Sequence, residues 1–276
     1  MSKTRQDDDV RSTVRQQYGQ IAGGSASSCC GGGCGPGPEA SRALGYSEDD
    51  LAGLPDGANM GLGCGNPQAI AALREGETVV DLGAGGGFDC FLAARQVGPT
   101  GRVIGIDMTP EMVSKARKNA AELGTTNVDF RLGEIEHLPL ADGCVDVILS
   151  NCVINLSPDK AAVFADAFRV LKPGGRLAIS DVVATAKLPA ALERDVNALT
   201  GCVAGAADVA TVRDLLESAG FVSIAIEVSE ASRQFIADWM PGSGVERYVA
   251  SASIQAIKPG AASCCGPSCC SEETPG

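Results

Sequence analysis

Short apolar runs alternate with helical patterns between residues 76 and 181, and this alternation constrains the fold more than any other feature of the chain. Amphipathic patterns over 88–97, 110–123 and 159–171 separate most of the runs, which read ETVVDL, RVIGID, NVDFRL, CVDVILS and GRLAISD. Strands joined by helices of this length form βαβ units, whose crossovers require a parallel sheet covered by helices on both faces. We therefore predict an α/β fold with a mostly parallel sheet.

Different patterns flank this core. Residues 7–22 predict a helix, because an apolar stripe recurs at three- and four-residue spacing, and a glycine-rich stretch follows. Beyond Asp181 the chain reads as an alanine-rich helical stretch, a helix over 209–219 and two apolar runs, FVSIAIEV and YVASASIQAIK, which we expect to pair as an antiparallel edge. The predicted parts are an N-terminal helical and cysteine-rich segment (1–75), the core (76–181), a sheet-completing C-terminal region (182–258) and a flexible cysteine-rich tail (259–276).

The charge balance excludes some classes of partner. The chain carries 22 Lys and Arg against 34 Asp and Glu, a net charge of −12 that would repel nucleic-acid phosphates and anionic lipid. No stretch is apolar over the roughly 18 residues that a membrane-spanning helix needs, and the start MSKTRQDDDVRS lacks the apolar core of a secretory signal. We expect a monomeric, cytoplasmic protein with neither nucleic-acid nor membrane partners.

Cysteine is the most unusual part of the composition. The chain has 12 cysteines, and in a reducing cytoplasm few would form structural disulfides. Seven lie in two segments rich in Gly, Ser and Pro, SSCCGGGCGPGP and SCCGPSCC, which have too few apolar residues for a packed core. Binding of a soft ion or redox exchange would account for them. Of the five others, we assign Cys90 and Cys144 to packing, because free cysteine is a common small core residue.

The string VVDLGAGGGFD places a glycine loop directly between a predicted strand and a predicted helix. Glycines such as Gly83 and Gly85 let a backbone turn tightly and approach a ligand closely. Asp107 ends the next strand, 24 residues beyond Gly83, where an acidic side chain can accept hydrogen bonds from ribose hydroxyls. Phe88 occupies the place of the third glycine of the dinucleotide motif, and this departure weighs against NAD.

With Asp81 before the loop, Asp107 after the second strand and LKPGG before the fifth, the core resembles the class I S-adenosylmethionine methyltransferases. The resemblance implies a glycine loop against the methionine part of S-adenosylmethionine and Asp107 against its ribose. It also implies that Met108, Glu134 and Ile135 surround the adenine and that Asn151 lies near the reactive methyl group. The implied cofactor-binding residues are Asp81, Gly83, Gly85, Asp107, Met108, Glu134, Ile135 and Asn151.

Four longer strings narrow the resemblance: GLGCGNP, GIDMTPEM, GEIEHLPLADGCVDVILSNCVINLSPDK and GCVAGA. Together they resemble the arsenite methyltransferase family over most of the chain. The resemblance implies that Cys152 and Cys202 bind arsenic and that Cys64 joins them as a third thiolate. It also implies a redox relay completed by an N-terminal cysteine, for which both Cys29 and Cys30 fit.

The implied chemistry suits cysteine. Trivalent arsenic is a soft, thiophilic centre with a lone pair and three binding directions, so three thiolates can hold it while the lone pair faces the electrophilic methyl carbon of a sulfonium. The resemblance implies arsenite or its thiol adducts as substrate, and a disulfide formed in turnover that thioredoxin or glutathione reduces. Replacement of Cys152 by Ser is expected to abolish methylation and to leave cofactor affinity nearly unchanged.

Two other functions fit parts of the sequence. A methyltransferase acting on a small organic acceptor, such as a quinone or a sterol precursor, would use the same cofactor loop and leave Cys152 and Cys202 dispensable. A non-catalytic metalloid-binding protein would use the cysteine-rich segments and turn over no cofactor. Arsenite methylation is the prediction that accounts for the loop, the internal cysteines and both cysteine-rich segments together.

Overall fold

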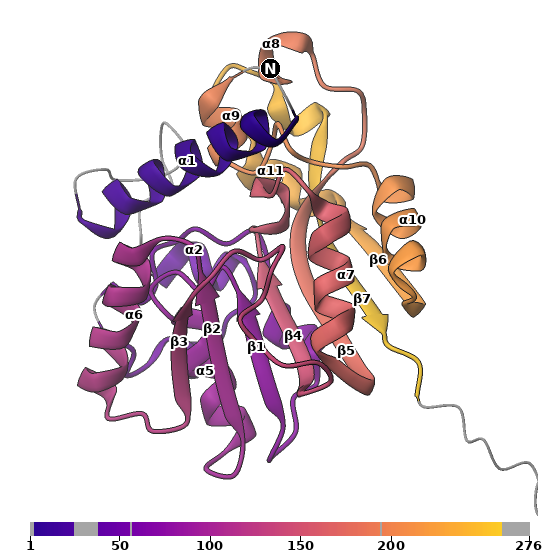
Figure 1. The fold of residues 1–276 in the computed structure, drawn as a ribbon. Helices are drawn as coiled ribbons and strands as arrows, with labels where there is room; N and C mark the ends of the chain where they lie inside the picture. The colour runs from indigo at the N-terminus through magenta and orange to yellow at the C-terminus, as the bar shows by residue number, and fades with distance from the viewer. Residues whose placement is uncertain (1–2, 25–37, 56, 194, 261–276) are drawn as a thin grey trace, which may run out of the picture.

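The computed structural model describes residues 3–24, 38–55, 57–193 and 195–260, and its centre is a seven-stranded sheet (Figure 1). The strands are β1 (Thr78–Leu82), β2 (Arg102–Asp107), β3 (Val128–Leu132), β4 (Val145–Asn151), β5 (Leu171–Ala184), β6 (Val222–Ser229) and β7 (Val249–Ile257). Their order is β3-β2-β1-β4-β5-β7-β6; the first five pair in parallel, and β7 is antiparallel to both β5 and β6. The predicted α/β fold, with a mostly parallel sheet and antiparallel C-terminal pairing, is confirmed.

The two C-terminal strands pair with each other as predicted, and the strand that lies outermost is β6. The last apolar run, β7, lies between β5 and β6 and is hydrogen-bonded along both edges. Burial accounts for this order, because β7 is buried along most of its length, whereas β6 alternates between half-buried and exposed side chains. A strand with one open edge and one solvated face shows this alternation.

The core helices agree closely with the predicted ones. α5 (Phe88–Val97), α6 (Pro110–Leu123) and α10 (Val209–Ala219) have the predicted bounds, and α7 (Lys160–Val170) is one residue shorter at each end. The carboxylate of Asp159 caps α7, and β5 begins at once with Leu171 and includes the KPGG segment. The other helices are α1 (Lys3–Ala22), α2 (Pro38–Ala43), α3 (Glu48–Leu51), α4 (Pro67–Ala71), α8 (Ala190–Glu193), α9 (Val196–Thr200), α11 (Arg233–Ile236) and the 3-10 helices η1 (Ile154–Leu156), η2 (Glu230–Ser232) and η3 (Val245–Arg247).

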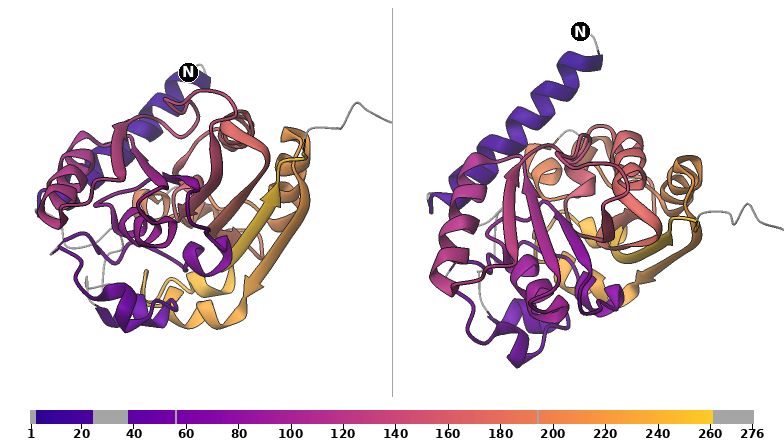
Figure 2. Two further views of the ribbon diagram at one scale, coloured as in Figure 1. Left: turned by 90° about the horizontal axis from the view of Figure 1, so that it is seen from below. Right: turned by 60° about the horizontal axis from the view of Figure 1, so that its bottom comes forward.

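Alternate strand residues supply two hydrophobic cores, one on each face of the sheet. Val80 packs in a core with Phe164 of α7 and Leu216 of α10. Its neighbour Val79 packs in a second core with Phe91 of α5, because successive side chains of a strand point to opposite faces. Figure 2 shows helices on both faces of the sheet. This three-layer arrangement leaves the carboxyl ends of the parallel strands as the place for a ligand.

A third cluster lies over that end of the sheet and joins segments that are far apart in the chain. Its buried members include Val14 of α1, Trp239 and three cysteines, Cys64, Cys152 and Cys202. Figure 1 shows α1 crossing above the sheet next to α9, and the two helices are in contact. The fold therefore brings Cys64, Cys152 and Cys202 together at the carboxyl end of the parallel strands.

Helix α1 is longer than predicted. It begins at Lys3 instead of residue 7, because its first turn is polar and adds nothing to the apolar stripe from which the helix was predicted. The stripe itself faces the protein, with Val14 and Ile21 buried. Among the described residues, no helix combines the length and the apolar character needed to cross a bilayer.

Candidate active site

A cleft lies between α1 and the carboxyl ends of the central strands. Its lining includes most of the predicted cofactor residues, which are Asp81, Gly83, Gly85, Asp107, Met108, Ile135 and Asn151. Cys152, directly after β4, lines the same cleft. Within the described residues, Glu134, Cys64 and Cys202 do not line it. All of the predicted cofactor residues except Glu134 thus share a cavity with one predicted arsenic ligand.

The glycine loop has the conformation that its composition requires. Gly83 has a φ of +69°, and a Cβ at this position would lie 2.5 Å from Cγ2 of Val153. Asp107 accepts hydrogen bonds from the backbone N–H groups of Gly85 (3.0 Å) and Thr109 (2.8 Å). Burial raises the pKa of Asp107. A carboxylate has about four acceptor positions, so this one retains the capacity to accept from a ribose diol.

Two buried carboxylates lie at the floor of the cleft. Asp81 accepts a hydrogen bond from the thiol of Cys90 (3.3 Å), and Asp89 accepts one from the hydroxyl of Tyr46 (2.8 Å). Burial raises the pKa of both, and the nearby charge of Asp89 adds to the rise for Asp81. An acidic floor favours a cationic ligand such as a sulfonium, whose charge would in turn lower both pKa values.

Asn151 connects this floor to the loop that carries Cys64. Its amide nitrogen donates to the carboxylate of Asp89 (3.3 Å) and to the carbonyl of Gly65 (2.9 Å), and its amide oxygen accepts from the N–H of Cys64 (3.1 Å). A Cβ on Gly63 would lie 2.8 Å from the Asn151 amide nitrogen, so the glycines around the cysteine permit this close approach. Asn151 therefore links the loop of Cys64 to the floor of the cofactor cleft.

Cys64 and Cys152 form a disulfide, with their Cα atoms 5.9 Å apart. The sequence predicts both as thiolates for arsenic, and the structure contains them as an oxidised pair. The backbone N–H of Cys152 donates to the carbonyl of Ser180 in β5 (2.9 Å). A carboxylate oxygen of Asp181 and the two sulfurs lie within 4.8 Å of one another. Residues from β4, from β5 and from the loop before α4 thus meet at one point.

Cys202 reaches the same point from the C-terminal region. Its thiol donates a hydrogen bond to the carbonyl oxygen of Cys152 (2.8 Å). Both residues have a left-handed backbone conformation, with φ of +55° at Cys152 and +63° at Cys202. Residues other than glycine rarely adopt this conformation. Strain of this kind costs on the order of 1–3 kcal/mol and is concentrated at functional sites. The three predicted arsenic ligands are therefore close together.

Asp181 is a further buried acid beside these cysteines. In the sequence it ends the apolar run GRLAISD, and nothing else in the pattern marks it as a site residue. Its carboxylate accepts from the N–H of Ile154 (2.9 Å) and from the side-chain amide of Asn155 (2.9 Å). Burial raises the pKa of Asp181 to about 6. These bonds fix η1 directly after Cys152, so Asp181 supports the backbone that carries the cysteine.

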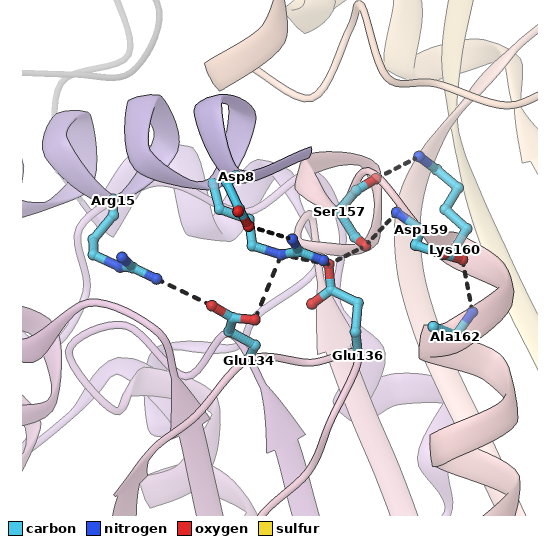
Figure 3. Close-up of polar contacts among 9 residues, drawn as sticks. Asp8, Arg15, Glu134, Glu136, Ser157, Asp159, Lys160 and Ala162 are labelled. Carbon is cyan, nitrogen blue, oxygen red and sulfur yellow. Dashed lines mark hydrogen bonds and ion pairs between the residues drawn. The ribbon is translucent and has the colours of Figure 1, made fainter. Parts of the chain in front are cut away.

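Ion pairs attach α1 to the segment after β3 (Figure 3). Arg11 contacts the buried carboxylate of Glu136 (3.2 Å), and Arg15 contacts Glu134 (3.2 Å). Glu136 also accepts from the hydroxyl of Ser157 (2.7 Å). Glu134, which the resemblance places at the adenine, here faces two arginines of α1, and Glu136 lines the cleft in its place. Arg11 and Glu136 carry no motif that would have marked them in the sequence.

The structure describes some of the remaining cysteines and leaves others outside the described residues. Cys29 and Cys30, and the four cysteines after residue 260, lie outside the described residues, and the redox role of Cys29 or Cys30 stays a prediction. Cys90 is fully buried and Cys144 is half-buried, with its thiol donating to the carbonyl of Ala141 (3.0 Å).

The cleft fits S-adenosylmethionine in four respects. Apolar side chains, among them Met108, Met112 and Ile135, offer a surface for a purine ring. The carboxylate of Asp107 offers acceptors for a ribose diol, and the acidic floor suits a sulfonium. The glycine loop leaves its backbone accessible, as an amino-acid moiety requires.

Comparisons with known proteins agree with this geometry. A family model described as a methyltransferase domain matches residues 73–220. An arsenite methyltransferase of Halobacterium salinarum is 52% identical over 271 residues, which cover 94% of this chain and 69% of that protein. The chain belongs to the arsenite methyltransferase family.

Two further relatives define how far the family likeness extends. The arsenite methyltransferase of Aquipseudomonas alcaligenes is 40% identical over 71% of this chain and 58% of its own length. A crystal structure is known of an arsenic(III) S-adenosylmethionine methyltransferase from Chlamydomonas reinhardtii, whose sequence is 34% identical to this one. The two structures match with a TM-score of 0.58, over 81% of this chain and 74% of that one. This member of the arsenite methyltransferase family thus spans between about half and three quarters of these relatives, and its cofactor is S-adenosylmethionine.

Proposed function

We propose that the protein methylates trivalent arsenic and that Cys64, Cys152 and Cys202 are the thiolates that hold it. The observation that carries the proposal is the position of Cys152, which lines the cofactor cleft, is bonded to Cys64 and accepts a hydrogen bond from Cys202. Three soft sulfur ligands match the three binding directions of trivalent arsenic. The relatives named above as arsenite methyltransferases support the same substrate.

Binding and orientation are the main contributions of the chain. S-adenosylmethionine supplies an electrophilic methyl group when it is bound. Asp107 orients the ribose, and Asn151 holds the loop of Cys64 against the cleft. Arsenic attacks through a lone pair and loses no proton, so the site needs no general base. Proximity of two bound reactants can therefore supply most of the acceleration.

The finer part of the proposal concerns the oxidation state. Methylation raises arsenic formally from trivalent to pentavalent, and two thiols that join in a disulfide return two electrons and release two protons. The Cys64–Cys152 disulfide supports this pair as the electron source. Cys29 or Cys30 would pass the oxidation to thioredoxin or glutathione in the cytoplasm, which restores the two thiols for the next turnover.

A single turnover tests both parts. The protein is reduced with a phosphine, freed of reductant and mixed with arsenite and methyl-labelled S-adenosylmethionine; arsenic species are then separated and remaining thiols are alkylated for mass spectrometry. We expect labelled methylarsenic together with loss of alkylation at Cys64 and Cys152. Cofactor binding without any labelled arsenic would overturn the proposed substrate. Labelled arsenic with both thiols still open to alkylation would overturn the disulfide pair alone.

A further inference from the structure

A second cavity reaches Cys64, whereas the cofactor cleft reaches its disulfide partner Cys152. The second cavity is bounded by α2, the loop around Asn66, the neighbouring strands β5, β7 and β6, and α11. The cofactor cleft and the second cavity have no lining residue in common. The two disulfide-bonded residues therefore border different cavities.

The lining of the second cavity is rich in hydroxyl groups. Ser180, Ser253 and Glu227 lie opposite one another across β5, β7 and β6, so their side chains share one face. Ser251 and Ser229 form the next row on that face, two residues along. All five line the cavity. Glu227 and Ser229 are exposed, whereas Ser180 and Ser251 are buried, so these polar rows run from solvent toward the buried cysteine.

One of these hydroxyls lacks a partner. Ser251 is only 6% exposed, and its Oγ makes no hydrogen bond within the described part of the chain. A buried hydroxyl left in this state loses its hydration without compensation, and a ligand that hydrogen-bonds to it would restore the lost interaction. Ser251 therefore points to an occupant that the protein itself does not supply.

The charge of the lining defines that occupant further. Among the described residues, Glu227 is the only charged one that lines the cavity, and no Lys or Arg does. An anion would be repelled by this carboxylate, with no cation among the described lining residues to compensate. The lining therefore selects a small neutral molecule that both donates and accepts hydrogen bonds.

We propose that the second cavity admits arsenous acid, the neutral trihydroxy form of arsenite, to the sulfur of Cys64. This inference rests on the function proposed above. With Cys64 in the thiol form, its sulfur displaces one hydroxyl from arsenic: a sulfur–arsenic bond forms, an arsenic–oxygen bond breaks, and the thiol proton leaves with the hydroxide as water. The oxidation state of arsenic is unchanged. Glu227 disfavours anionic thiol adducts of arsenic on this route.

A separate entry has a kinetic consequence. Arsenous acid and the cofactor reach the cysteines through different cavities, so a filled cofactor cleft leaves arsenic entry open. The two reactants then meet at the sulfur cluster from two directions, and neither has to bind before the other.

Stopped-flow fluorescence of the full-length protein tests the route. Trp239 is the only tryptophan in the chain and belongs to the buried cluster of the three cysteines, so it reports arsenic binding. Phosphine-reduced protein is mixed with arsenous acid, with and without saturating S-adenosylhomocysteine in the cleft. We expect the association rate to be unchanged by S-adenosylhomocysteine, to fall about fivefold in Ser251→Ala, the equivalent of one hydrogen bond, and to fall further in Ser253→Ile, which fills the cavity.

Ser150→Ala is the matched control, because Ser150 also has a buried hydroxyl without a partner among the described residues but lines neither cavity. Affinity for S-adenosylhomocysteine reports that each variant is folded. An association rate that S-adenosylhomocysteine slows, or wild-type rates in both cavity variants, would overturn the route while arsenic binding itself upholds the proposed function. Reduced wild-type protein that binds no arsenic would overturn the proposed function instead.

Discussion

The thiol of Cys202 donates a hydrogen bond of 2.8 Å to the main-chain carbonyl of Cys152, which is itself disulfide-bonded to Cys64. Three cysteines separated by 88 and 50 residues in the chain therefore meet in one buried cluster. Binding of Cys202 to arsenic would remove the thiol proton and with it this hydrogen bond. The contact thus couples occupation of the site to the backbone of Cys152.

Replacement of Cys202 by Ser keeps a hydrogen-bond donor at this contact but replaces a soft ligand with a hard one. We expect Cys202→Ser to fold normally and to hold arsenic through two sulfurs, where the reduced wild type uses three. X-ray absorption of the arsenic-loaded proteins measures this number directly. Cys144→Ser, at a half-buried cysteine away from the cluster, should retain three sulfurs; three sulfurs in Cys202→Ser would show that Cys202 is not a ligand.

Asp107 is expected to contribute to cofactor affinity through an ionised acceptor. Asp107→Asn keeps the shape of the side chain but replaces a charged acceptor with a neutral amide, a loss of about 1.5–3 kcal/mol for a hydrogen bond to a charged group. Affinity for S-adenosylhomocysteine, measured by calorimetry, should fall about tenfold to a hundredfold. Asp129→Asn, a half-exposed acid on β3, serves as the control and should bind as the wild type does.

Helix α1 depends on the pair of Arg11 with Glu136. Arg11→Met leaves the carboxylate of Glu136, which is 4% exposed, with the hydroxyl of Ser157 as its hydrogen-bond donor in the described part of the chain, and such a loss costs about 3–5 kcal/mol in a buried pair. We expect faster hydrogen exchange over residues 3–22 and weaker binding of S-adenosylhomocysteine, because α1 lines the cleft. Arg42→Met breaks an exposed pair with Glu48 and should change neither quantity. Unchanged exchange in Arg11→Met would contradict this role of the pair.

The lowered pKa of Glu77 predicts that the free energy of unfolding depends on pH. Burial alone would raise its pKa, but bidentate hydrogen bonds from Arg176 (2.7 and 2.9 Å) lower it below the ordinary 4.5. A carboxyl with a lowered pKa in the folded state stabilises the protein fully above its ordinary pKa, and this contribution is lost as the pH falls below 4.5.

Glu77→Gln should therefore lower the free energy of unfolding by about 1.5–3 kcal/mol at neutral pH. The difference from the wild type should shrink as the pH falls below 4.5. Urea unfolding at neutral pH and at the lowest pH where both proteins stay folded measures it. A difference that is equal at both pH values would mean that the charge of Glu77 is not the cause.

Much of the fold could be predicted because its signals are local. The glycine loop, the acid at the end of β2 and the periods of α5, α6 and α10 each depend on residues within one turn or one strand of each other. The position of β7 between β5 and β6 could not be read in this way. It depends on which of the two C-terminal apolar runs is hydrogen-bonded to a neighbouring strand on both sides. Only the assembled sheet decides this.

The same distinction between local and long-range signals applies to the residues of the site. Cys152 follows a predicted strand, and its place at the cleft follows from topology, whereas the resemblance to a family was needed to join it with Cys64 and Cys202. Arg11, Tyr46, Asp89, Glu136 and Asp181 all support the site, and none has a spacing that marks it. Each acts through a contact with a residue more than 20 positions away, so only the folded chain brings out its part.

The most direct test of the account is methyl transfer by wild-type protein and by Cys152→Ser, with labelled S-adenosylmethionine, arsenite and excess reduced thiol. Of the three cysteines that the described structure brings together, Cys152 is the one that lines the cofactor cleft. We predict labelled methylarsenic from the wild type and none from Cys152→Ser, with equal affinity of both for S-adenosylhomocysteine. Labelled methylarsenic formed at the wild-type rate by Cys152→Ser would contradict the claim that arsenic is methylated while this sulfur holds it.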